Sequence, residues 1–319
     1  MVELGIVIVN FRTPDLTIDC LRSLAPEADA IPGLRAIVVE NASGDLSDAR
    51  IEQAIAEQGW GGWASLVRSP RNGGFAFGNN VAIRMLRGAR RILLLNSDTI
   101  VHPGALRASM DALDADPRVG VLSCRLLNAD GSVQNVARRF PTPLRLIVCA
   151  TALTWRFPRL FGWANTDDPA WDRDTLARDV DWLGGAFMLV RGDLMERLGG
   201  LDESFFFYGE DIEFCHRAWR AGFRCRYDPR ASITHLGGSS SDPTRLNSRA
   251  RNRHAWAGRY LVLRRCHGLF AEWLIRAVDV LAYAIRAAWY TLTLNPAKRR
   301  DMLVVLSIIT RPGSQRAAA

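Results

Sequence analysis

No other feature of this sequence limits its fold as strongly as the alternation of short apolar runs with helix-like segments over residues 1–125. The runs are rich in Val, Ile and Leu and lack regular polar alternation, as strands buried on both faces do. They lie at Leu4–Val9, Ala36–Val39, Ala64–Val67, Ile92–Leu95 and Val119–Leu122. Because helical spacing separates them, the sequence predicts an α/β fold with a mostly parallel sheet and helices on both faces.

Several helices can also be placed from the sequence. Thr13 is expected to cap a helix that begins at Pro14. The other expected helices are Phe77–Gly88, Pro103–Ala115, Gly192–Leu198 and Glu210–Arg220. Residues 126–180, with scattered tryptophans and prolines, predict a long irregular connection of the kind that often forms binding loops.

Composition narrows the class of protein. With 48% hydrophobic and 23% charged residues, the composition is that of a globular protein and excludes wholesale disorder, collagen and coiled coil. The length of 319 residues allows one large domain with an appendage, or two domains. The six cysteines are scattered, which favours free thiols in a reducing compartment. No apolar run reaches the roughly 18 residues of a membrane-spanning helix, and the first ten residues indicate a strand rather than a signal peptide. We therefore expect a cytoplasmic protein.

The basic charge is concentrated at the C-terminal end. Net charge is +8, and residues 245–319 hold fourteen Arg and Lys residues against three acids. We therefore divide the chain into a domain at 1–244 and a basic helical tail at 245–319. Such a tail suggests an anionic surface, either membrane or nucleic acid. No zinc-finger, homeodomain or RRM signature is found, so no nucleic-acid partner is expected.

One segment of this tail is strongly amphipathic. All its charges fall on one narrow helical face, formed by Glu272, Arg276, Asp279, Tyr283 and Arg286. The remaining positions are mostly apolar, so this wide apolar face either packs against protein or lies in a membrane interface. The surrounding arginines and a second apolar stretch, Met302–Ile309, favour peripheral membrane association.

Polar residues follow the predicted strands, where ligands bind in parallel sheets. Asn96-Ser97-Asp98 ends one buried run, and Asp98 is suited to bind Mg²⁺ or Mn²⁺ on a diphosphate. An ordinary turn aspartate would give the same pattern. The glycine-rich segment RNGGFAFGNN (71–80) permits close backbone approach, although it lacks the spacing of a Walker loop and also suits a plain turn into a helix.

Two further segments carry candidate chemistry. Glu210, Asp211 and Glu213 begin a predicted helix, where the helix dipole alone favours acids. The preceding aromatic run, FFFY, would instead raise the pKa of a carboxyl that acts as a general base. His235 is either structural or a second metal ligand.

Together these segments resemble the family 2 glycosyltransferases of the Rossmann-like GT-A fold. The resemblance covers about residues 4–240 through VIVNFRTPDL, VVENASGD, NGGFAFGNN, LLLNSDT, WLGGAFMLVRGDLMERLGGLDESFFFYGEDIEFCHRAWRAGF and ITHLGGSSS, in that order. Within the family, the chain looks most like bacterial rhamnosyltransferase-like enzymes of cell-surface polysaccharide assembly.

The resemblance implies a role for each matching position. Val9 and Phe11 would contact the nucleotide base, and Glu40 stands where the family usually has an aspartate. The expected nucleotide-binding set is completed by Arg71, Gly74, Asn80 and Ser97. Asp98 and His235 would hold the metal, and Asp211 would be the catalytic base with Glu210 as its acidic neighbour. The donor and acceptor pocket would be lined by Gly184, Gly185 and Ala186.

The implied reaction is inverting transfer from a nucleotide-diphosphate sugar, dTDP-rhamnose first and a UDP-sugar next, to a hydroxyl of a glycan or lipid-linked saccharide. The divalent cation would offset the diphosphate charge, and Asp211 would take the proton of the attacking hydroxyl. The alternative is a non-catalytic module that binds sugar nucleotides or glycans. It is favoured by Glu40 and by the single carboxylate in the Asn96-Ser97-Asp98 motif.

Overall fold

The computed structural model describes residues 2–151, 153–167, 176–237 and 248–311, with only the backbone for 248–252. Within these residues a central sheet of nine strands has the order β3-β2-β1-β4-β10-β6-β11-β5, and β8 pairs with β11. The strands are β1 (Leu4–Asn10), β2 (Leu34–Glu40), β3 (Ala64–Arg68), β4 (Arg91–Asn96), β5 (Thr99–Val101), β6 (Val119–Leu127), β8 (Arg178–Val180), β10 (Phe187–Arg191) and β11 (Arg224–His235).

The sheet is mostly parallel, as the sequence predicts. β3, β2, β1, β4, β6 and β11 share one direction, whereas β10, β5 and β8 run the opposite way. Each of the five predicted apolar runs lies inside a strand. Leu4, Ile6, Val7 and Ile8 of β1 are fully buried, which explains why this run shows no polar alternation.

Helices connect the successive strands of the first part of the sheet. They are α1 (Pro14–Ala30), α2 (Ser47–Glu57), α3 (Gly74–Met85) and α4 (Ala105–Asp114), with a 3-10 turn η1 (Trp60–Gly62). The chain passes from β1 to β2 and β3 in one direction and returns to β4 in the other. Right-handed crossovers therefore place α1 and α2 on one face of the sheet and α3 on the other.

The local expectations hold with two corrections. Pro14 begins α1, but the Thr13 side chain makes no capping hydrogen bond to the helix. Its hydroxyl donates instead to Asn10 Oδ1 at 3.2 Å, because the end of β1 lies next to it. Helix α3 spans Gly74–Met85, so it begins and ends three residues before the predicted Phe77–Gly88. Glycine permits the positive φ of 88° at that position.

The predicted connection at 126–180 contains short elements. Its described residues form β7 (Ala137–Arg138), α5 (Pro143–Ala150), α6 (Leu153–Arg156), α7 (Pro158–Phe161), η2 (Gly162–Ala164) and β8. Strand β7 pairs with β9 (Trp182–Leu183) in a separate two-stranded sheet. The chain then continues through β10, α9 (Gly192–Leu198) and α10 (Glu210–Arg220), and both helices match their predicted bounds.

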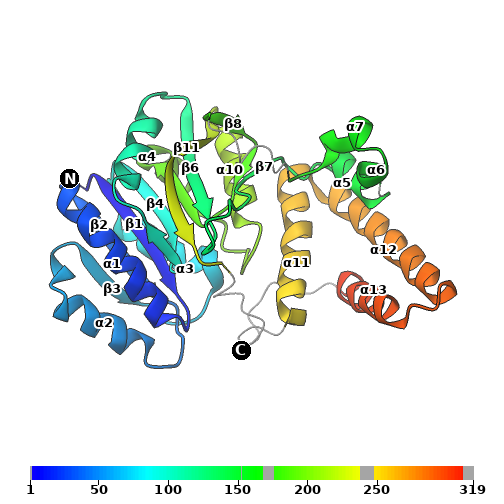
Figure 1. Ribbon diagram of the computed structural model, residues 1–319, viewed down its shortest axis with the longest axis horizontal. Coiled ribbons are helices and arrows are strands. Elements are labelled where there is room, and N and C mark those ends of the chain that lie inside the picture. The colour runs from blue at the N-terminus through cyan, green and yellow to red at the C-terminus, as the bar shows by residue number, and fades with distance from the viewer. Residues whose placement is uncertain (1, 152, 168–175, 238–247, 312–319) are drawn as a thin grey trace.

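Three long helices follow: α11 (Ser248–His267), α12 (Leu269–Leu292) and α13 (Pro296–Ile309). Figure 1 shows α12, α13 and α5–α7 apart from the sheet, with α11 between them and the α/β part. A second hydrophobic cluster holds these helices together through Leu146, Tyr260, Leu263, Ile275 and Ile309. The helical region therefore includes α5 as well as the tail. The predicted boundary at 244 lies outside the described residues.

Helix α12 is inverted relative to an ordinary surface helix, because its charged face is covered and its apolar face is exposed. No helix in the described part of the chain combines the length and apolar content needed to cross a membrane. The charged face of α12 is turned inward: Asp279 is buried, and Arg276 and Glu272 are largely covered. The opposite face leaves Phe270, Trp273, Leu281, Ile285 and Trp289 exposed.

Candidate active site

A buried carboxylate lies directly after β4. Val9 of β1 pairs with Asn96 of β4, so both strands end at the same edge of the sheet. Asp98 follows in a turn and is only 3% exposed, and its Oδ1 atom has no hydrogen-bond partner. The nearest basic group is His235 at the end of β11, with Nε2 3.3 Å from that oxygen. Leaving a carboxylate oxygen buried and without a hydrogen bond is costly, so Asp98 is a candidate for binding a ligand that supplies the missing contact.

Gln134 fixes the orientation of the His235 ring. Its Nε2 donates to the backbone oxygen of His235 at 2.6 Å and to Asn128 Oδ1 at 2.7 Å. The amide oxygen of Gln134 therefore faces His235 Nδ1, 2.7 Å away, and accepts its hydrogen. In the neutral ring, Nε2 then carries the lone pair. Asn96 Nδ2, 3.3 Å away, donates to it, and Asp98 Oδ1 lies at the same distance from Nε2.

This pair of acceptors fits a divalent cation. A carboxylate oxygen without a partner faces an imidazole lone pair, and both ligand types bind Mg²⁺ or Mn²⁺. Within the described ranges, no group of three His, Cys, Asp or Glu side chains gathers as a metal site. Asp98 and His235 would therefore leave coordination positions for other ligands, such as phosphate oxygens.

The second carboxylate group begins α10. Gly209 at the N-cap has φ 103°, a conformation that suits glycine, and the helix starts with Glu210 and Asp211. Asp211 Oδ2 accepts from Gly185 N–H at 3.2 Å, and Oδ1 accepts from Ile212 N–H at 2.8 Å. A Cβ added at Gly185 would lie 3.8 Å from Asp211 Cβ and 3.7 Å from Phe75, so these three residues meet.

Both carboxyl groups are shifted toward the protonated form. Burial raises the pKa of Glu210, and the neighbouring charge of Asp211 raises it further. Burial also raises the pKa of Asp211, while the N–H groups of Ile212 and Gly185 and the charge of Arg138 lower it. Glu210 Oε2 is buried without a hydrogen-bond partner. A carboxylate of raised pKa is the more effective general base.

The two carboxylate groups are connected through one short segment. Asp211 is bonded to Gly185, and the next residue, Ala186, accepts the N–H of Asn96 at 3.0 Å. Asn96 in turn contacts His235. Asn96 and Ala186 therefore link the Asp98–His235 pair to Asp211, and a shared catalytic role for positions 98, 211 and 235 stays a prediction.

The predicted base-binding residues lie at the ends of β1 and β2. Val9 is half-buried, and a Cβ at Gly78 would come within 3.0 Å of it, so glycine brings α3 close to β1. The Arg12 guanidinium lies over the Phe11 ring, 5.1 Å from its centre. Glu40 Oε1 accepts from Ser43 N–H at 2.8 Å. The exposed Arg71 stacks over Phe77.

Three predicted nucleotide-binding residues have structural partners. A Cβ at Gly74 would lie 2.1 Å from the backbone oxygen of Phe206, so this glycine permits contact with the loop before α10. The side-chain amide of Asn80 donates to the Leu201 carbonyl and to Glu203, and it accepts from the Leu201 N–H. Ser97 Oγ lies 3.3 Å from Thr13 Oγ1. Nucleotide binding by this set stays a prediction.

Three residues near the site were not predicted from the sequence. Gln134, Arg138 and Phe75 surround His235 and Asp211, but the first two lie in the stretch that predicted only an irregular connection. The short pairing of β7 with β9 brings Arg138 to this place, and the sequence carries no signal for it. Phe75 lies inside the glycine-rich segment 71–80, so the sequence could have indicated that it lies near the site.

Helix α11 fixes the loop before α10. The His254 ring stacks on Phe206 at 5.0 Å, and Arg265 Nε pairs with Asp202 at 2.8 Å. A Cβ at Gly209 would lie 2.8 Å from Val262. The first tail helix therefore supports the segment that carries Asp211, a contact that the division at 244 did not anticipate.

The chain has a GT-A fold, as its central sheet and its structural neighbours show. The chain superposes on the mannosyltransferase PcManGT from Pyrobaculum calidifontis, solved with GDP-Man and Mn²⁺, with a TM-score of 0.55 and 15% identity over 97% of this chain and 85% of that one. GalNAc-T7, solved with UDP, GalNAc and Mn²⁺, gives a TM-score of 0.56 and 13% identity over 83% and 48% of the two chains.

The family follows from the sequence comparisons. The model for glycosyltransferase like family 2 matches residues 3–259, and the chain belongs to that family. It is 33% identical over 147 residues to an N-acetylglucosaminyl-diphospho-decaprenol L-rhamnosyltransferase of Mycobacterium tuberculosis. It is 29% identical over 171 residues to rhamnosyltransferase WbbL of Escherichia coli. The matches cover 45% and 51% of this chain, and 46% and 60% of the relatives.

Proposed function

We propose that this protein is an inverting glycosyltransferase that moves a sugar from a nucleotide-diphosphate donor to a hydroxyl of a glycan or lipid-linked saccharide. The observation that carries the proposal is the position of Asp211, bonded to Gly185 at the same sheet edge as the Asp98–His235 pair. The rhamnosyltransferase relatives favour dTDP-rhamnose as donor, followed by a UDP-sugar.

The residues divide the chemistry between them. Asp98 and His235 would hold a divalent cation, Mg²⁺ or Mn²⁺, which would offset the charge of the leaving diphosphate. Asp211 accepts the proton of the acceptor hydroxyl as its oxygen attacks the anomeric carbon. The Gly185 N–H holds one oxygen of Asp211 and so orients the carboxylate. Direct attack from the face opposite the diphosphate inverts the anomeric configuration, and catalysis rests on positioning and charge stabilisation.

The test is a panel of sugar nucleotides with release of nucleoside diphosphate as the readout. With the donor that works, Asp211→Asn is expected to lower the rate about 10²- to 10⁴-fold, the contribution of a general base, with little change in donor affinity. Asp193→Asn is the matched control. Asp193 also lies in the first turn of a helix and accepts the N–H of the next residue at 2.8 Å, but it is exposed. It follows the end of β10 at Arg191, which pairs with the start of β4 and so lies at the opposite edge of the sheet from Asn96.

Two results would count against this assignment. Equal rates for Asp211→Asn and the wild type would remove Asp211 from the role of base. Donor binding without any diphosphate release, across the panel and with acceptor present, would instead support a non-catalytic sugar-nucleotide-binding module.

We also propose peripheral contact with the inner face of the cell membrane, which places the enzyme in the cytoplasm where a lipid-linked acceptor meets it. The support is the outward apolar face of α12, which carries Phe270, Trp273, Leu281, Ile285 and Trp289. The excess of basic over acidic residues at 245–319, fourteen against three, complements an anionic lipid surface.

Vesicle sedimentation tests this contact with two matched double variants. Leu281 and Leu292 on α12 are 63% and 79% exposed, whereas Leu46 and Met85 in the α/β part are 74% and 58% exposed. L281Q/L292Q is expected to weaken binding to anionic vesicles about tenfold or more, since buried apolar area drives interfacial binding. L46Q/M85Q should leave binding unchanged, and equal behaviour of the two variants would overturn the proposed face.

A further inference from the structure

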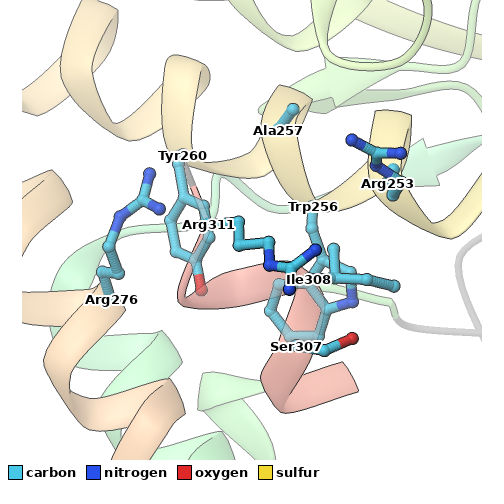
Figure 2. A pocket seen from close by; sticks show the side chains of 8 residues that line it. All are labelled: Arg253, Trp256, Ala257, Tyr260, Arg276, Ser307, Ile308 and Arg311. Carbon is cyan, nitrogen blue, oxygen red and sulfur yellow. The ribbon is translucent and has the colours of Figure 1, made fainter. Parts of the chain in front are cut away.

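A small cavity lies between α11, α12 and the end of α13, away from the candidate active site. Its volume is about 60 Å³. Figure 2 shows its lining, in which arginines from three parts of the chain surround two aromatic rings. The lining residues are Arg253, Trp256, Ala257, Tyr260, Arg276, Ser307, Ile308 and Arg311.

One of the arginines is held firmly in place. Arg276 donates to the backbone oxygen of Ile309 at 3.1 Å and to Glu272 at 3.0 Å. Its guanidinium lies 4.1 Å from the centre of the Tyr260 ring. These contacts fix one guanidinium at the wall of the cavity before any ligand binds, which lowers the entropic cost of binding.

The other two arginines bring charge that the neighbouring residues leave uncompensated. Arg253 and Arg311 are exposed, and neither forms an ion pair with any residue in the part of the chain that the structure describes. Figure 2 shows the Arg311 side chain extending between Tyr260 and Trp256. No acidic residue belongs to the lining.

The nearest acids are already paired. Glu272 contacts Arg264 at 3.3 Å and Arg276 at 3.0 Å. Asp279 accepts from Arg259 at 3.3 Å and from the Tyr260 hydroxyl at 3.1 Å. The cavity therefore combines three guanidinium groups with aromatic and aliphatic walls, a setting that favours a small, multiply charged anion.

We propose that this cavity binds the phosphate group of an anionic lipid headgroup. Phosphate oxygens match the paired donors of a guanidinium, and a cavity of about 60 Å³ suits a single phosphate rather than a whole nucleotide. The choice of a lipid rests on the proposed membrane contact, because α12 both lines the cavity through Arg276 and carries the exposed apolar face. A soluble phosphate ester shares this chemistry and is the alternative source.

Two double variants with the same change in charge test the site. R253Q/R311Q removes the two unpaired arginines of the cavity, whereas R299Q/R300Q removes two exposed arginines of α13 outside it. Sedimentation uses vesicles of phosphatidylcholine with phosphatidylglycerol. We expect R253Q/R311Q to bind at least tenfold more weakly than R299Q/R300Q, and R253K/R311K to recover part of the loss. Equal losses in the two glutamine variants would overturn the site, because bulk charge would explain them.

Calorimetry with inorganic phosphate and sn-glycerol 3-phosphate forms the second arm and needs no membrane. Binding to the wild type that R253Q/R311Q abolishes and R299Q/R300Q retains supports the cavity, even if vesicle binding fails. In that case the ligand is soluble and only the membrane contact is lost. Absence of phosphate binding together with equal vesicle binding by the two variants rejects the cavity, while transfer by Asp211 remains a separate question.

Discussion

The buried acidic side chains of the sheet edge and the buried aspartate of α12 are bonded in opposite ways. At the sheet edge, Asp98 Oδ1 and Glu210 Oε2 are buried without hydrogen-bond partners. In the helical region, both oxygens of the buried Asp279 are bonded, one to Arg259 and the other to Tyr260. The first arrangement costs stability, whereas the second holds three helices together.

This difference indicates where each region is expected to bind a ligand. Groups left without partners inside a fold are found where a ligand supplies the missing contact. The helical region bonds both oxygens of its buried Asp279 internally, although Arg259 Nε and Glu272 Oε2 also lack hydrogen-bond partners there. Because this region exposes apolar side chains, its function is expected at the outer surface and in the arginine-lined cavity. Variants in the α/β site should therefore change ligand binding more than stability, and variants of the inner face of α12 should do the reverse.

The largest effect on ligand affinity is expected from Asp98→Ala. Donor affinity in the presence of Mn²⁺ should fall at least about 100-fold, because loss of a ligand exceeds the 10- to 100-fold cost of losing a second-shell partner. Stability without metal should not fall, since the variant removes a buried oxygen that has no hydrogen-bond partner. Calorimetry with and without Mn²⁺, together with thermal unfolding, measures both. Unchanged affinity would contradict the metal site.

Gln134→Ala should give the next effect. Without the amide, nothing holds the hydrogen on Nδ1 of His235, so the Nε2 lone pair no longer faces Asp98 reliably. We expect metal affinity to fall about 10- to 100-fold. Asn128→Ala is the control, because Asn128 contacts Gln134 and not the histidine. An equal or larger loss in the control would show that the loop, rather than the ring orientation, matters.

A pair of substitutions in α12 tests the inverted helix. Asp279→Ala is expected to lower the free energy of unfolding by about 1–2 kcal/mol, because it leaves the Tyr260 hydroxyl and Arg259 without this partner. Ile285→Ala, on the exposed face, should change it by less than about 0.5 kcal/mol. Denaturant titration compares them. If the exposed isoleucine proves the more costly to remove, the apolar face packs inward in solution.

The sequence predicts the α/β part well because its signals are local. A strand buried on both faces must be a continuous apolar run, and the positions of Asn96, Asp98 and Asp211 follow from where strands and helices begin or end. Contacts made by irregular segments are not local. Gln134 and Arg138 reach the site only through the fold of the connection between β6 and β10, which no periodic pattern encodes.

The tail shows a different limit of sequence reasoning. The pattern of α12 correctly places Glu272, Arg276, Asp279 and Arg286 on one face, but an amphipathic pattern does not say which face turns inward. Hydrophobicity alone would bury Phe270 and Trp273 rather than Asp279. The charged face turns inward because α11 supplies Arg259 and Tyr260, and residues distant in sequence decide that choice.

The smallest effect concerns the pH dependence of stability. Burial and Asp211 raise the pKa of Glu210 above its ordinary value of 4.5, so above that pH the unfolded chain loses this proton while the folded chain keeps it. The Glu210 contribution to stability is therefore present at low pH and is lost as pH rises toward the raised pKa. Glu210→Gln does not titrate. Between pH 5 and 6 the wild type should lose about 1 kcal/mol relative to the variant, measured by denaturant unfolding at each pH. Parallel pH profiles would show that Glu210 is solvated in the folded protein, and the contrast with the fully bonded Asp279 would disappear.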